Sequence, residues 1–205
     1  MTITMYDLAG AEADRRFSPF CWRTKMALAH KGLAVETVPW RFTEKDKLPQ
    51  PNAGRVPVIV DGGRVVHDST AIADYLEERY PDRQSLFGGT AGRALARFVQ
   101  NWTETVLQTG LIRLVVLDIH RHCTPEDRAY FRRSREERFG ASLEDVVRDP
   151  RGTAARVLHQ PRPVAPHRRA ARFYLRQGPG LRRLRRLRRL SVGARDQRPR
   201  GTRGR

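Results

Sequence analysis

The chain has 205 residues, a formal charge of +18 and only two cysteines, which excludes a collagen, a disordered acidic tail and a disulfide-dense miniprotein. The charge is unevenly placed, because residues 148–205 contain 19 arginines, no lysine and two acidic residues, whereas residues 1–147 contain 21 basic and 20 acidic residues. The first 147 residues therefore have the charge balance of an ordinary globular protein, and the basic excess that would point to nucleic acid or an anionic membrane belongs to the rest.

The sequence shows no signal for secretion, membrane insertion or metal binding. The N-terminus lacks a basic start followed by a long apolar core, and the most apolar later stretch, residues 111–119, is interrupted by Arg113 and Asp118. Cys21 and Cys123 are too few and too far apart for a disulfide framework, and neither has a histidine or cysteine at metal-ligand spacing. We therefore expect a cytoplasmic protein without a metal site.

The first 40 residues predict a strand, a helix and a second strand. Residues 2–7 alternate and are rich in β-prone side chains, which indicates a strand. A helix is expected next, with Ser18 as its N-cap, Pro19 at its first position and Gly32 just beyond its basic last turn. Residues 35–40 are predicted to form the second strand, which completes a βαβ unit.

A hairpin and a second helix are expected after a polar loop. Residues 56–66 contain two short β-rich runs around the Asp-Gly-Gly sequence at 61–63, the usual signal for a two-strand hairpin. The following helix begins near Asp68 and Ser69, which are its cap candidates, and stops before Pro81. The predicted order up to this point is therefore β-α-β-β-β-α.

The hydrophobic period becomes helical from Gly92 onward. Residues 93–119 predict one long, largely buried helix. A second helix is expected over residues 124–140, with Thr124 as its cap and Pro125 at its first position. The sequence thus predicts a smaller α/β domain followed by a helical domain.

Ser18 is the first candidate for chemistry. It lies where the first strand feeds the first helix, so free backbone N–H groups and the positive end of the helix dipole would stabilise an anion there, such as a thiolate. The alternative is that Ser18 only caps its helix. Cys21, three residues later, is open to two interpretations as well: a reactive thiol near a helix N-terminus, or a small packed side chain.

Two further places in the α/β part could bind a ligand. A cis peptide between Val56 and Pro57 would leave the backbone of Val56 free to pair with a peptide-like ligand, and a trans proline at a strand start is the alternative. Ser69 could bind a carboxylate through its hydroxyl and the helix N–H groups, while Asp68 attracts an ammonium. Ordinary helix capping would explain the same two residues.

Together these motifs resemble the glutathione transferase superfamily. Residues 17–33 look like its first loop and helix, residues 54–63 like its cis-proline hairpin, and residues 67–81 like its γ-glutamyl-binding turn and helix. The first of these segments, followed by VPWRFTEK at 38–45, is most similar to the bacterial β-etherase-like branch.

The resemblance implies a thioredoxin-like glutathione-binding domain at residues 1–88 and an all-α domain, here truncated, at residues 89–147. It also implies glutathione as co-substrate, a small electrophilic or aryl-ether second substrate, and a homodimer.

The same resemblance implies roles for five residues. Ser18 would donate a hydrogen bond to the glutathione sulfur, and Val56 would pair its backbone with the cysteinyl moiety beside cis-Pro57. Asp68 and Ser69 would hold the γ-glutamyl end. A serine rather than a cysteine at position 18 implies transferase or ether-cleaving chemistry rather than thiol reduction.

Residues 148–205 depart from the family. They contain six of the 13 prolines, almost no acidic residues and no lysine, a composition typical of a GC-rich gene read out of frame. We interpret this segment as a disordered tail produced by a frameshift near residues 147–149. Loss of the family's later helices would leave apolar faces uncovered at Trp102, Leu111 and Leu114.

Three other interpretations stay open. The arginine-rich segment could be an arm that binds nucleic acid or anionic lipid. Its leucines at 181, 184, 187 and 190 argue against this, because a three-residue spacing drifts by about 60° per step around an α-helix. The chain could also be a non-catalytic module with the glutathione transferase fold, or an inactive frameshifted product.

Overall fold

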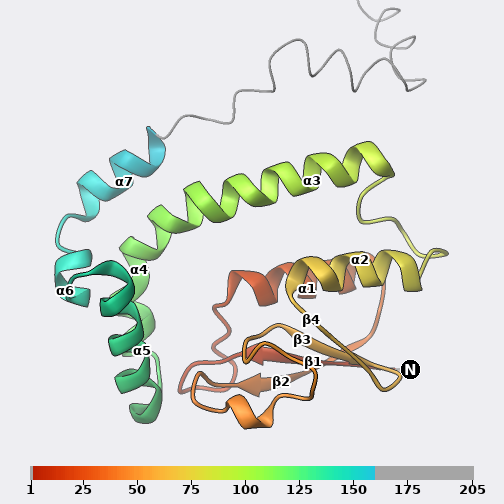
Figure 1. Cartoon of the computed structure of the whole chain (residues 1–205), viewed down its shortest axis with the longest axis horizontal. Helices are drawn as coiled ribbons and strands as arrows, with labels where there is room; N and C mark the ends of the chain where they lie inside the picture. Colours follow the sequence, from red (N-terminus) through yellow and green to blue (C-terminus); the bar gives the residue numbers. More distant parts are fainter. Residues whose placement is uncertain (1, 160–205) are drawn as a thin grey trace, which may run out of the picture. The chain divides into compact units, whose positions relative to one another are not determined.

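The computed structural model describes residues 2–159, whose N-terminal half contains one four-stranded mixed sheet (Figure 1). Its strands are β1 (Ile3–Leu8), β2 (Val35–Trp40), β3 (Val58–Asp61) and β4 (Arg64–His67), in the spatial order β2-β1-β3-β4. The β1–β2 pair is parallel, whereas the β1–β3 and β3–β4 pairs are antiparallel. The predicted βαβ unit and hairpin are therefore confirmed.

Two helices cover one face of this sheet, as Figure 1 shows. They are α1 (Pro19–His30) and α2 (Ser69–Arg79), and a short 3₁₀ turn, η1 (Lys45–Lys47), lies in the loop between β2 and β3. Alternate residues at the start of β1 point into the core, because Ile3 and Met5 are buried while Thr4 and Tyr6, which alternate with them, are half-buried. Leu28 of α1 and Leu76 of α2 are fully buried in the same core. This arrangement is the predicted thioredoxin-like domain.

The helical part begins with one continuous helix that contains a π-helical turn. It runs through α3 (Thr90–Trp102), the π-helical turn η2 (Thr103–Leu107) and α4 (Gln108–Arg121). It is followed by α5 (Pro125–Phe139), α6 (Leu143–Val146) and α7 (Pro150–Leu158). Thr124 caps α5 by accepting a hydrogen bond from the Asp127 N–H, and Gly140 ends it in a left-handed conformation. The predicted helix order and the Thr124 cap are confirmed.

The prediction that the long helix is largely buried is wrong. No residue of α3 is buried, and on α4 only Val116 is. Leu95 is 62% exposed, and Leu111, which we expected to be uncovered, is 42% exposed, whereas Trp102 and Leu114 are half-buried. The helical periodicity of apolar residues indicates that a helix has an apolar face, but it does not indicate whether another element covers that face.

Asp127 joins the helical part to the sheet domain. The carboxylate is buried, with 1% exposure, although it belongs to the first turn of α5. Its oxygens accept hydrogen bonds from the backbone N–H of Phe42 (3.1 Å) and from both the N–H (2.9 Å) and the hydroxyl (2.8 Å) of Thr43, which lie just after β2. The aspartate thus fixes the loop that leads to η1 against the start of α5.

Replacing Asp127 by alanine is therefore expected to lower the free energy of unfolding by about 3 kcal/mol, because two backbone N–H groups lose a charged acceptor at once. Urea denaturation followed by circular dichroism measures the loss. Asp118→Ala is the matched control, since the Asp118 side chain on α4 is 63% exposed and, among residues 2–159, forms a surface ion pair with Arg121 alone. Equal losses in the two variants would contradict the assigned role.

Helix α7 lies inside the segment that we expected to be a tail from residue 148 onward. Asp149 caps it by accepting a hydrogen bond from the Gly152 N–H (2.8 Å), and α7 packs on α4, where Val157 leaves no room for a side chain at Gly110. The expectation of a disordered tail is wrong for residues 150–158, because a cap and a packing partner are both present. The same expectation for residues 160–205 concerns a segment outside the described residues. None of the helices described between residues 2 and 159 has the length and apolar character of a membrane-spanning segment.

Candidate active site

Ser18 caps α1 at the end of the loop that follows β1. Its side chain is 5% exposed, and its Oγ accepts a hydrogen bond from the Cys21 N–H (3.3 Å). The first turn of α1 contains no acidic residue that would neutralise the positive end of the helix. The capping role is therefore confirmed, and because the oxygen accepts the Cys21 N–H, the rotatable hydroxyl hydrogen can be donated to a bound anion.

Cys21 is a packed side chain. It is fully buried, and burial raises the pKa of its thiol to about 12, an effect that the hydrogen bond with Ser18 only partly offsets. The thiol is thus protonated at neutral pH, which contradicts the reactive-thiol interpretation.

The Val56–Pro57 peptide is cis, as the resemblance implied. Val56 precedes the first paired residue of β3, which is Val58, so the ladders to β1 and β4 do not use its backbone groups. Tyr6 of β1 pairs with Val58, and continuing this antiparallel register by two residues places Val56 beside Leu8. Val56 therefore lies at the carboxyl end of β1, where the loop to Ser18 begins.

Asp68 and Ser69 form the start of α2. Asp68 has a φ of 71°, and its carboxylate accepts hydrogen bonds from the N–H groups of Thr70 (2.8 Å) and Ala71 (3.0 Å). A positive φ is costly for a residue other than glycine and is found most often where function requires it. Ser69 is 3% exposed, and its Oγ accepts a hydrogen bond from Arg23 Nη1 at 3.2 Å.

Arg23 connects the two helix N-termini to the helical part. It lies on α1 five residues after Ser18, and the same Nη1 that contacts Ser69 also donates to Glu104 Oε1 at 2.8 Å. Glu104 belongs to the π-helical turn η2. Both partners of this ion pair are about one-third exposed. The sequence analysis missed both residues, because Glu104 is 81 positions from Arg23 and no local pattern connects them.

Asp7 is a second residue that the sequence analysis missed. It is fully buried near the end of β1, and its Oδ2 lies 2.8 Å from Lys25 Nζ and 3.2 Å from Arg16 Nη1. These two ion pairs hold α1 and the loop before it against β1, and so help to position Ser18.

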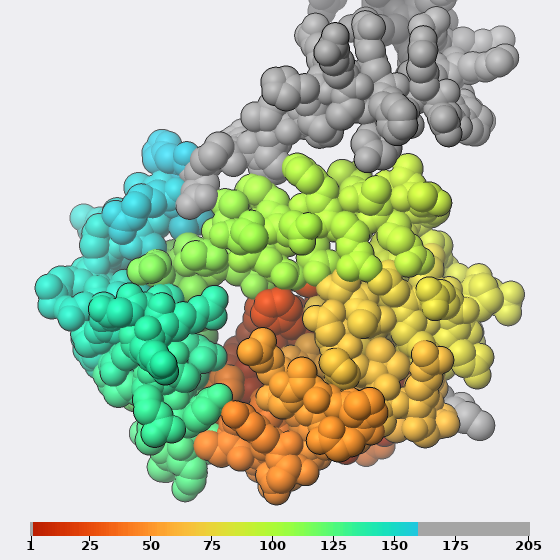
Figure 2. Space-filling model, viewed as in Figure 1, coloured from red at the N-terminus to blue at the C-terminus, as the bar shows by residue number. Residues whose placement is uncertain are grey.

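Figure 2 shows a hollow in the surface beside these elements. The helices α3 to α5 border it on one side and the loop between β2 and β3 borders it on the other. Atoms of the N-terminal segment, red in the figure, lie at its floor. The β1–β3 register places Val56 near the end of β1, and the contact of Arg23 with Ser69 brings the start of α2 close to α1, which Ser18 caps.

The chain belongs to the glutathione transferase superfamily. The family model for the glutathione S-transferase N-terminal domain matches residues 13–84, and the model for the C-terminal domain matches residues 94–161. The second match extends past residue 147, where we expected the family likeness to end.

Individual relatives support the same assignment. The chain is 30% identical over 140 residues to a zeta-class glutathione S-transferase of Euphorbia esula. This match covers 65% of this chain and 62% of that protein. A glutathione S-transferase of Ceriporiopsis subvermispora, crystallised with glutathione, superposes with a TM-score of 0.64 at 27% identity, over 76% of this chain and 67% of that one. The chain spans less than two thirds of the length of the curated relatives named first.

The expected β-etherase-like branch receives weaker support. The β-etherase LigF of a Sphingobium strain superposes with a TM-score of 0.50 at 20% identity, over 75% of this chain and 69% of that one. A likeness at that identity shows the shared fold and does not distinguish one branch of the superfamily from another.

Proposed function

We propose that this chain is a glutathione transferase in which Ser18 activates the glutathione thiol for attack on an electrophilic or aryl-ether substrate. The observation that carries the proposal is the placement of an unopposed helix N-terminus and a hydroxyl donor at Ser18, beside a second helix N-terminus at Ser69. We infer a homodimer and a cytoplasmic location as well, since both are usual for the superfamily and both cysteines are free.

The Ser18 hydroxyl would stabilise the thiolate relative to the thiol. Lowering a thiol pKa of about 8.5 by two units requires about 2.7 kcal/mol. One charge-assisted hydrogen bond together with the dipole of α1 supplies a free energy of that size. The thiol proton leaves to solvent, and the sulfur lone pair forms a bond to an electrophilic carbon while the leaving group departs with its electron pair. For an aryl ether, the leaving group is a phenolate.

The other site residues would hold the peptide. Ser69 binds the γ-glutamyl carboxylate through its hydroxyl and its own N–H, because the next N–H groups of α2 already donate to Asp68, and Asp68 attracts the γ-glutamyl ammonium. The unpaired backbone of Val56, beside Pro57, adds the cysteinyl residue as a short extra strand at the sheet edge. In this division of roles, Val56, Asp68 and Ser69 bind the peptide, and Ser18 activates its thiol.

We also propose a domain division. Residues 1–88 form the glutathione-binding domain, and the helical domain starts at α3 after Gly88 and Gly89. Helix α7 and the family match to residue 161 extend the second domain beyond residue 147 and support a later start of the out-of-frame segment. Resequencing of the codons that follow residue 147 tests this, because an intact frame there excludes a frameshift.

Binding of glutathione tests the proposed function most directly. The full-length chain is expected to be retained on immobilised glutathione, and Ser69→Ala is expected to abolish retention, because it removes a buried hydroxyl from the γ-glutamyl end. Ser134→Ala is the matched control, since that hydroxyl bonds the Phe131 carbonyl of its own helix. A soluble, folded chain that is not retained would exclude the proposal. Retention without conjugation of an aryl halide would favour a non-catalytic module.

A further inference from the structure

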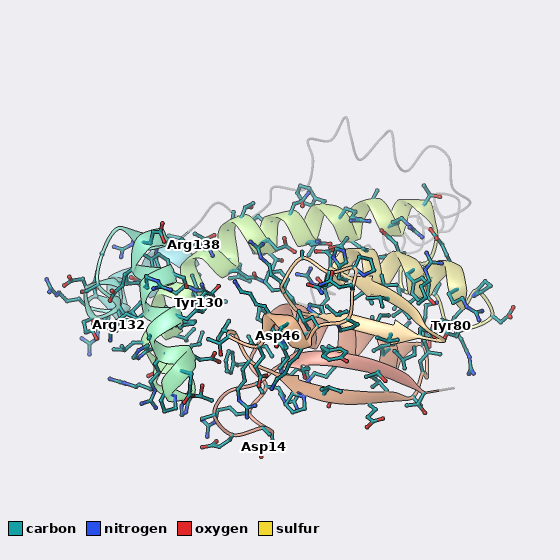
Figure 3. The ribbon with its side chains drawn as sticks, turned by 60° about the horizontal axis from the view of Figure 1, so that its bottom comes forward. Asp14, Asp46, Tyr80, Tyr130, Arg132 and Arg138 are labelled. Carbon is teal, nitrogen blue, oxygen red and sulfur yellow. The ribbon has the colours of Figure 1, made fainter. Side chains whose placement is uncertain are left out.

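A pocket lies at the C-terminal end of α2, the end opposite Ser69. It has a volume of about 450 Å³ and is bordered by the turn between β3 and β4 and by the C-terminal end of α2. Ser69 and Arg79 are the two ends of this 11-residue helix, and the ten steps between them correspond to about 15 Å along its axis. In Figure 3, Tyr80 from this pocket lies at the other side of the sheet domain from Tyr130 and Arg138 of α5. The pocket is therefore separate from the proposed glutathione site.

Three arginines converge on this pocket. Arg64 is the first residue of β4, Arg79 is the last residue of α2, and Arg83 follows in the turn after α2. Within the described part of the chain, none of the three makes an ion pair or a side-chain hydrogen bond, although most other arginines there are paired. The pocket thus gathers three guanidinium groups whose donors have no protein acceptor.

Two tyrosines contact two of these arginines, Arg64 and Arg79, without neutralising them. The guanidinium of Arg64 lies 4.9 Å from the centroid of the Tyr75 ring, and that of Arg79 lies 5.4 Å from the centroid of the Tyr80 ring. Such cation–π contacts hold a guanidinium in place and leave its N–H groups free at the edge.

The two rings are fixed by a single acidic residue. Both tyrosine hydroxyls donate to Asp61 Oδ2, Tyr75 at 2.8 Å and Tyr80 at 2.7 Å, and Asp61 is 8% exposed. Burial and the neighbouring carboxylate raise the pKa of Tyr80 to about 12, so its hydroxyl remains a donor to Asp61. The carboxylate is therefore satisfied by two O–H groups, and the lining keeps three positive charges against one negative charge.

We propose that this pocket, lined by Arg64, Arg79 and Arg83, binds a phosphate dianion, either free phosphate or a phosphate monoester. Each guanidinium can donate two parallel N–H groups, and a tetrahedral dianion offers enough oxygens and charge for all three, whereas a carboxylate satisfies one. The volume exceeds that of a phosphate group and leaves room for an attached organic group. Arg64, Arg79 and Arg83 are exposed to solvent, as are Glu78 and Asp82 nearby in sequence, but these two acidic residues do not line the pocket.

The test follows the backbone amides of Gly62 and Gly63, which form the turn beside the pocket, by NMR of the full-length chain. Saturable shifts are expected with inorganic phosphate and with phenyl phosphate, and not with sodium chloride at equal ionic strength. Tighter binding of phenyl phosphate would assign a monoester, and equal binding would assign free phosphate. Because the readout is local, phosphate bound by arginines elsewhere does not contribute.

Matched variants separate this site from general charge. Arg64→Gln combined with Arg83→Gln is expected to weaken phosphate binding at least about tenfold, whereas Arg121→Gln combined with Arg133→Gln removes the same charge from α4 and α5 and should leave it unchanged. Should the first pair fail to fold, Arg83→Gln alone serves, because its side chain makes no hydrogen bond within the described residues. Shifts that stay linear, that chloride reproduces, or that survive in the Arg64/Arg83 double variant would overturn the proposal. Retention on glutathione should be unchanged in both pairs.

Discussion

Ser18→Ala is expected to lower kcat/KM for conjugation of glutathione to an aryl halide about a hundredfold at pH 7. A loss of this size is typical when an enzyme loses one hydrogen-bond donor that stabilises an anion, here the glutathione thiolate. The reason is that the Ser18 hydroxyl is the donor at the N-terminus of α1, and the nearby Cys21 thiol, whose pKa is raised to about 12, cannot replace it. Steady-state kinetics with saturating electrophile measures the change.

The pH dependence gives this prediction its sign. Without the donor, the pKa of the bound glutathione thiol rises toward that of a free thiol, about 8.5. The variant therefore gains activity as the pH rises, whereas glutathione bound to the parent chain is already ionised. The ratio of the two rates should therefore shrink between about pH 6.5 and pH 8.5 and approach one above pH 9. Ser18→Thr retains a hydroxyl and a cap, and it should keep most of the activity. A ratio that is constant from pH 6 to pH 10 would show that Ser18 only caps its helix.

Local sequence signals predicted the sheet domain because they act within a few residues. The Ser18–Pro19 pair and Gly32 mark the ends of α1, and the two glycines after Asp61 mark the hairpin. Each of these signals depends on backbone conformation at one position, which neighbouring residues largely determine. The same is true of the Thr124 cap on α5.

The contacts that complete the site were not predictable in this way. The contact of Arg23 with Glu104 depends on how η2 packs against α1, and that packing is set by the whole fold rather than by the residues near either partner. The exposure of Leu95 and Val115 has the same origin, since the residues that would cover an apolar face lie elsewhere in the chain or in another molecule. The site residues that the motifs indicated are therefore the ones that cap helices or precede strands.

Glu104→Gln is expected to raise the KM for glutathione about tenfold and to leave kcat at saturating glutathione within about twofold. Glu104 holds Arg23, and Arg23 in turn donates to the Ser69 oxygen, which leaves the Ser69 hydroxyl hydrogen directed at a bound carboxylate. Without the negative charge, Arg23 loses its fixed position and the γ-glutamyl end binds more weakly, whereas the sulfur at Ser18 is unaffected. The proposal therefore assigns Glu104 a positioning role, and the split between KM and kcat would distinguish it from Ser18.

A double-mutant cycle with Arg23→Gln completes the argument. If the two residues act through one contact, the double variant should bind glutathione no more weakly than the worse of the two single variants. Glu144→Gln is the matched control, because Glu144 also pairs with an arginine, Arg132 at 2.9 Å, but between α5 and α6. Additive losses in the cycle, or a KM change of the same size in Glu144→Gln, would show that η2 does not take part in binding the peptide. A loss confined to the Arg23–Glu104 pair would extend the proposed glutathione site from the sheet domain into the helical domain.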